Sequence, residues 1–210
     1  MSTQTIVRPI TDGAYTALMQ LVRPHSSEEL FEFQRTRLAD EKLAETGMFD
    51  RFANILPRLP KHGLFLLVPP QPRSPDWNEL MARVELDGMT GLNLLDREYH
   101  KDIIEVPDVP TVLIGVEDGR GRRNINPSVS RKAIPAEGRT AYYTWRGYIH
   151  VFLFPMVLKH HNMDMVGSLC KNDCVPDFYL CADGPALGEH WHDDAAPDWG
   201  APSCVGSIER

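Results

Sequence analysis

The chain has 210 residues, of which 42% are hydrophobic and 24% charged, with a formal net charge of −7 at pH 7. This composition suits a soluble globular protein with an ordinary core, and the acidic balance argues against nucleic acid as a partner. No apolar run approaches the roughly 20 residues that span a bilayer. Residues 1–13 lack the apolar core of a signal peptide. We therefore expect a cytoplasmic protein that has no membrane partner.

The N-terminal third predicts helices. Thr11-Asp12 suits the cap of a first helix, and Ser26 with Glu29 has the spacing of a capping box at the start of a second. A short third helix is expected over Met48–Leu56. We therefore expect residues 1–62 to form an N-terminal helical segment.

The middle of the chain predicts strands and helices in alternation. Leu64–Val68 and Thr111–Val116 are short apolar runs between turn residues, which is typical of buried strands. Asp76 suits a helix cap, Pro127 the first position of a second helix, and Thr144 the cap of a third with an apolar face.

The last fifty residues change character. MDMVGSL, VPDFYLCA and ALGEHWH are short runs separated by turn residues, a pattern that predicts a three-stranded antiparallel meander. The expected fold class is α+β, with N-terminal helices packed on a mixed sheet that ends in this C-terminal meander. Residues 63–210 form the α+β body, either separate from the helical segment or continuous with it as one domain.

Several short motifs follow one another in a recognisable order: EVPDVPTVLIGVEDG, NINPS, EGRTAYYTWRG, MVGSLC, VPDFYL and GAPSC. In this order they resemble a bacterial family known only as a domain of unknown function, over roughly the last two-thirds of the chain. The resemblance implies that Cys170 and Cys204 belong to the shared pattern. It also implies that His190 replaces a cysteine, while Ala141 stands where the family tends to have proline.

The stretch GEHWHDD predicts a metal site. His190 and His192 are two residues apart, so on a strand their side chains point the same way. Cys170 and Cys204 could supply two sulfur ligands to complete a tetrahedral zinc site. The spacing lacks a tight Cys-x-x-Cys pair, so the motif is weaker than a zinc-ribbon pattern.

Two other interpretations of these residues stay open. In the first, the histidines are exposed beside a half-buried Trp191 and the thiols are small buried side chains. In the second, Cys170 or Cys204 forms a thiolate–imidazolium pair with His190, which Asp193 or Asp194 orients.

Two further groups have an ordinary interpretation beside a catalytic one. Glu117 and Asp118 follow a strand, where carboxylates can be catalytic or magnesium-binding but are also common turn residues. His160 and His161 are expected at a helix end, where capping is the simpler role.

The sequence thus predicts a module that binds a small molecule or another protein, with zinc as a structural metal held by Cys170, His190, His192 and Cys204. The alternative is a metal-assisted or cysteine-dependent enzyme of unknown substrate, with Glu189 or Asp193 as a general base in the metal case. Loss of the fold on chelation would indicate a structural metal, whereas loss of turnover alone would indicate a catalytic one.

Overall fold

The computed structural model describes residues 11–13, 26–59, 64–95 and 100–209. Its α+β architecture combines helices with a mixed sheet that contains C-terminal antiparallel strands, as expected. The helix predicted after Thr11-Asp12 lies mostly outside the described residues. The described helices are α2 (Ser27–Asp40), η1 (Asp50–Arg58), α3 (Trp77–Met81), η3 (Arg120–Arg122), α4 (Pro127–Ala136), α5 (Thr144–Leu153), η4 (Pro155–Lys159) and η5 (Lys171–Asp173).

The strands form two larger sheets and three short pairs. The first sheet has the order β1-β6-β14, the second β12-β8-β10-β11-β4, and the pairs are β13-β7, β2-β3 and β5-β9. The bounds are β1 Leu66–Val68, β2 Glu85–Leu86, β3 Met89–Thr90, β4 Leu92–Asn93, β5 Lys101–Asp102, β6 Thr111–Ile114, β7 Thr140–Ala141, β8 Asn162–Asp164, β9 Ser168–Leu169, β10 Cys174–Cys181, β11 Gly184–Trp191, β12 Trp199–Gly200, β13 Ser203–Cys204 and β14 Gly206–Ile208.

The predicted meander is confirmed in its strand order. β10 pairs antiparallel with both β8 and β11, in the order in which these strands follow along the chain. Two parallel partners that the sequence did not indicate extend this sheet, with β12 beside β8 and β4 beside β11. The segment around Ser168, predicted as part of the first meander strand, instead pairs with β5.

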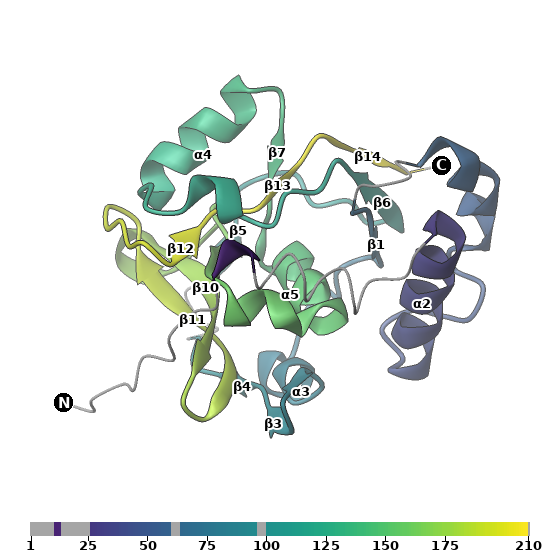
Figure 1. Ribbon diagram of the computed structural model, residues 1–210, viewed down its shortest axis with the longest axis horizontal. Helices are drawn as coiled ribbons and strands as arrows, with labels where there is room; N and C mark the ends of the chain where they lie inside the picture. The colour runs from purple at the N-terminus through teal and green to yellow at the C-terminus, as the bar shows by residue number, and fades with distance from the viewer. Residues whose placement is uncertain (1–10, 14–25, 60–63, 96–99, 210) are drawn as a thin grey trace.

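Helix α5 lies between the two larger sheets and is buried along its whole length (Figure 1). A helix that is apolar on nearly every side belongs in a core, and its Trp145, Tyr148 and Phe152 all join the main hydrophobic cluster. Pro155 ends the α-helix, and the chain continues as the 3₁₀ helix η4. Thr144 is the first helical residue, and Tyr143 takes the cap position.

The N-terminal helical segment packs directly on the body. The capping box of α2 is present, with Ser26 and Glu29 each bonded to the other's backbone N–H. The buried Gln34 donates to the carbonyl oxygen of Phe65 at 3.0 Å and accepts from Leu67 N–H at 2.9 Å. Residues on both sides of the predicted boundary at 62/63 therefore share one core.

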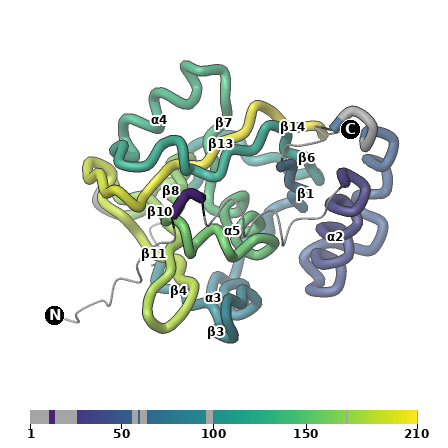
Figure 2. The backbone as a smooth tube through the Cα atoms, in the orientation of Figure 1, coloured from purple at the N-terminus to yellow at the C-terminus, as the bar shows by residue number. Residues whose placement is uncertain are grey.

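The C-terminal chain crosses the molecule. Figure 2 shows it, in yellow, running from the region of β10 and β11 to β14, which pairs with β6. On the way β13 pairs with β7, just before α5 begins. In the described part of the chain no helix is long and apolar enough to cross a membrane.

Candidate functional site

The two cysteines predicted as zinc ligands lie in different surroundings. Cys170 is buried beside Glu189 and Cys174, and burial together with these charges raises the pKa of its thiol. Cys204 lies on β13, where burial raises its pKa against the opposing charges of Arg146 and Arg139. Neutral thiols are poor nucleophiles, so this arrangement does not favour a thiolate.

The two histidines differ as well. His190 lies on β11 with its Nδ1 3.3 Å from Asp164 Oδ1, and its ring centroid is 3.7 Å from that of Trp199. His192 follows the end of the strand, and its Nε2 is 3.2 Å from Asp193 Oδ2. Trp191 between them is 48% exposed.

The four predicted ligands do not form a metal centre in this arrangement. Within the described ranges, no group of three or more His, Cys, Asp or Glu side chains is placed to hold a metal ion. Zinc binding therefore stays a prediction that the geometry does not support. The buried thiols match the simpler interpretation, but the histidine side chains are only 10% and 20% exposed while Trp191 is 48% exposed, the reverse of what that interpretation expected.

A buried pair of carboxyl groups lies next to His190. Asp164 and Asp177 are direct partners across β8 and β10, and they are 1% and 0% exposed. Asp164 Oδ2 and both oxygens of Asp177 have no hydrogen-bond partner in the described structure. Burial raises the pKa of both groups, and the charge of Asp164 raises that of Asp177 further. The pair is therefore biased toward holding protons rather than a double negative charge.

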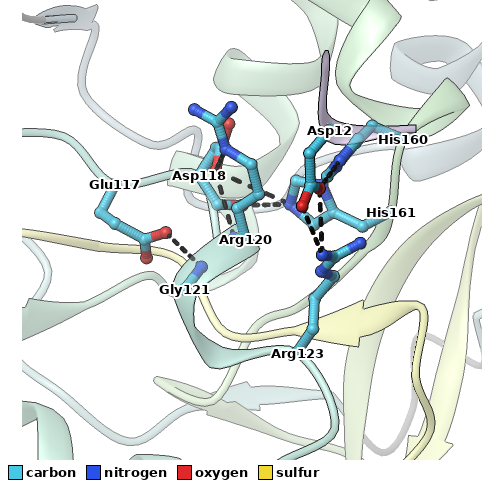
Figure 3. Close-up of polar contacts among 8 residues, drawn as sticks. All are labelled: Asp12, Glu117, Asp118, Arg120, Gly121, Arg123, His160 and His161. Carbon is cyan, nitrogen blue, oxygen red and sulfur yellow. Dashed lines mark hydrogen bonds and ion pairs between the residues drawn. The ribbon is translucent and has the colours of Figure 1, made fainter. Parts of the chain in front are cut away.

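Glu117 and Asp118 form a turn, as their ordinary interpretation predicts (Figure 3). Asp118 Oδ1 accepts from Arg120 N–H at 3.1 Å, and Glu117 Oε1 accepts from Gly121 N–H at 3.0 Å. Gly119 has a φ of 104°, which favours glycine.

His160 is the C-cap residue of η4, as expected at a helix end, and both His160 and His161 are buried next to this turn (Figure 3). His161 Nε2 donates to the carbonyl oxygen of Asp118 at 2.8 Å, so a neutral His161 accepts at Nδ1 from His160 Nδ1, 2.8 Å away. His160 Nε2 lies 2.6 Å from Asp12 Oδ1. Both nitrogens of His160 thus face acceptors, which favours the imidazolium although burial lowers its pKa. The network joins residues 11–13 to the turn.

The burial of His161 predicts acid sensitivity. Burial lowers its pKa from 6.5 to about 4, although Asp118 opposes the shift. The unfolded chain takes up the proton first, so this contribution to stability is complete above pH 6.5 and is lost as the pH falls toward 4. The loss is about 3 kcal/mol. We expect His161→Gln to flatten this part of the pH profile of urea unfolding. His192→Gln, at a more exposed ring, should leave it unchanged, and equal slopes for wild type and His161→Gln would contradict the account.

A directed hydrogen-bond chain joins the start of α5 to β5 and β9. Ser168 Oγ donates to Asp102 Oδ1 at 2.6 Å, and Thr144 Oγ1 donates to Ser168 Oγ at 3.0 Å. Thr144 can then only accept from His100 Nε2, 2.7 Å away, which places the imidazole proton on Nε2. His100 lines a hollow of about 200 Å³. Thr144 and Ser168 are 0% exposed, so their hydroxyls are closed to a substrate and serve to fix the imidazole.

Arg146 is the least satisfied charged group near an opening. It lies in the first turn of α5, is 3% exposed, and neither Nε nor Nη1 has a hydrogen-bond partner in the described structure. A cation at a helix N-terminus also meets the positive end of the helix dipole. Buried charges are normally paired, and the described residues leave Nε and Nη1 of Arg146 without a hydrogen-bond partner.

Three described neighbours of Arg146 supply no counter-charge. Its guanidinium carbon lies 4.9 Å from the ring centroid of Tyr143. Burial raises the pKa of Tyr143 to about 12 and that of Tyr142 well above its ordinary value. Cys204 has a raised pKa too. All three groups are therefore neutral at pH 7, so none of them supplies a counter-charge to the guanidinium.

Arg146 lines a hollow of about 720 Å³, a volume typical of small-molecule sites. The irregular segment 104–109 forms one wall, and the other lining residues are Thr140, Ser207 and Glu209. Thr140 belongs to β7 and Ser207 to β14, so two strand pairs hold the walls in place.

Sequence reasoning did not select Arg146. The signal was present in TWRGYIHVFL, where one arginine interrupts the first turn of a helix that is otherwise almost entirely apolar. A lone arginine in a helix usually reaches solvent along its aliphatic stem. The sequence does not show that segment 104–109 lies at the same hollow as Arg146, so the burial of this arginine is evident only in the structure.

Comparison of the chain with protein-family models, with curated proteins and with solved structures finds no match. The resemblance to a family of unknown function therefore stays a prediction, and the site has to be interpreted from its own geometry.

Proposed function

We propose that the protein is a binding module for a small ligand that carries a carboxylate, which Arg146 holds at the floor of the hollow beside segment 104–109. The observation that carries this proposal is a buried guanidinium whose Nε and Nη1 have no hydrogen-bond partner among the described residues. An isolated buried ion costs several kcal/mol. An anion from outside the chain would offset that cost and satisfy the donors.

Two features favour a carboxylate over a phosphate. The chain carries a net charge of −7, and Glu105 and Asp108 line the same hollow. A group with one negative charge is repelled less by such surroundings than a dianion.

The other expectations remain separate proposals. A protein partner, a structural zinc, and a metal-assisted or cysteine-dependent enzyme are each compatible with the sequence. The described geometry adds no support for the metal or the thiolate, whereas the unpartnered nitrogens of Arg146 support ligand binding.

The Arg146→Met variant tests the proposal with hexanoate as the probe. Wild type is expected to bind hexanoate in calorimetric titration, and the variant should bind about ten- to a hundredfold more weakly, because it loses hydrogen bonds to a charged group. Without ligand the variant should unfold at a higher temperature, since a buried unpaired charge is replaced by an apolar side chain of similar length.

Arg73→Met is the matched control, because it removes one positive charge from an exposed arginine that lines a different hollow. It should leave hexanoate affinity within about twofold. The proposal is wrong if Arg146→Met binds hexanoate as tightly as wild type. It is equally wrong if that variant is destabilised without ligand, because Arg146 would then have a structural partner.

A further inference from the structure

We infer that the ligand of the Arg146 hollow is zwitterionic, with a carboxylate on Arg146, a short aliphatic spacer, and an ammonium group at the acidic rim. This inference rests on the proposed function and names the class of its ligand. It follows from how charge and apolar surface are distributed among the lining residues.

The charges that line the hollow have opposite signs at different depths. Arg146 is 3% exposed and supplies the positive charge of the lining. The acidic lining residues are Glu105, Asp108 and Glu209, and all three are exposed. A buried cation and an exposed acidic rim therefore face the same space.

This distribution of charge opposes the binding of a ligand that carries only a negative charge. A carboxylate that enters meets three exposed acidic side chains and one buried arginine in the lining, and the net charge of the whole chain opposes it as well. A ligand that also carries an ammonium group would cancel this repulsion and pair with the rim. The buried arginine fixes the orientation, with the carboxylate inward and the ammonium group outward.

Three aliphatic lining residues suit the spacer. Ile104, Val106 and Val109 are half-buried aliphatic side chains of the same wall. Burying a methylene group against such a surface contributes about 0.8 kcal/mol. An amino acid whose two charges are separated by several methylene groups fits both the apolar wall and the two charged ends.

Three probes with the same six-carbon chain separate the contributions of the two charges. Hexanoate carries the carboxylate alone, and 6-aminohexanoate adds the ammonium group; hexylamine carries the ammonium group alone. At low salt we expect wild type to bind 6-aminohexanoate about tenfold more tightly than hexanoate, and the ratio should fall as salt screens the exposed rim. Arg146→Met should lose affinity for both carboxylates.

The triple variant Glu105→Gln, Asp108→Asn, Glu209→Gln tests the rim. It should bring the ratio of the two affinities close to one while hexanoate binding is kept or strengthened. If wild type binds hexanoate at least as tightly as 6-aminohexanoate, the zwitterion inference fails and the carboxylate proposal stands. If neither carboxylate binds, or if hexylamine binds as well as 6-aminohexanoate and Arg146→Met changes nothing, the proposed function fails with it.

Discussion

Asp177→Asn is expected to raise the free energy of unfolding at pH 7, although it changes a fully buried residue. Asp177 is 0% exposed, and neither of its carboxyl oxygens has a hydrogen-bond partner among the described residues. Burial, with the charges of Asp164 and Glu189 added, raises its pKa well above 3.8. The folded protein therefore keeps a proton that the unfolded chain releases as the pH rises.

The sign of this effect follows from the pKa difference. Because the folded-state pKa is raised, the stability from this carboxyl is complete below pH 3.8 and is lost as the pH rises toward the folded pKa. Each pH unit in that window costs up to about 1.4 kcal/mol. Asparagine has the same shape and does not ionise, so the gain over wild type should be small at about pH 4 and grow toward pH 7.

Urea unfolding of wild type and of Asp177→Asn across this pH range measures the gain in free energy of unfolding directly. Asp183→Asn is the matched control, because Asp183 is exposed at the turn between β10 and β11, and it should show no such trend. A variant that is less stable than wild type at pH 7 would contradict the account. It would mean that the Asp177 carboxylate has a charged partner in solution, such as a bound cation.

Gly200→Ala is expected to destabilise the protein by about 3 kcal/mol or more. A Cβ at Gly200 would lie 2.1 Å from the carbonyl oxygen of Gly119 and 2.9 Å from its carbonyl carbon. Gly119 has a positive φ of 104°, and a Cβ there would lie 2.7 Å from the carbonyl oxygen of Gly200. Two backbones therefore cross at glycines, where neither can move aside as a flexible side chain would.

The crossing also positions the rest of this region. Gly200 belongs to β12, which pairs with β8, while Gly119 belongs to the turn that carries Asp118. Thermal unfolding should show a large drop for Gly200→Ala and little change for Gly206→Ala, where a Cβ would meet nothing within 4 Å. Equal melting temperatures for Gly200→Ala and wild type would show that the two backbones are not in contact.

Local signals in the sequence predicted local structure well. The capping box at Ser26 and Glu29 and the proline start of α4 at Pro127 both appear as expected. The turn residues around Asp183 correctly divided β10 from β11. Each of these signals acts between residues close together in the chain, so its outcome depends little on the remainder of the fold.

Contacts between distant segments could not be derived in the same way. The parallel pairing of β4 with β11 joins Leu92 to Ala186, and no turn residue fixes such a register. The zinc hypothesis required Cys170 and Cys204 to approach His190, and one sequence does not show which segments converge. The burial of Arg146 depends on segment 104–109 in the same way.

The environment of the Arg146 Nε–H group during titration with hexanoate tests the central claim most directly. Nuclear magnetic resonance of arginine side chains resolves this group, and Arg139 provides an internal control because its Nε already donates to Ser203 Oγ at 2.8 Å. The account predicts a saturable shift of the Arg146 Nε–H resonance and a nearly constant Arg139 resonance. Hexanoate at saturating concentration with an unchanged Arg146 resonance, or equal shifts at both arginines, would contradict it.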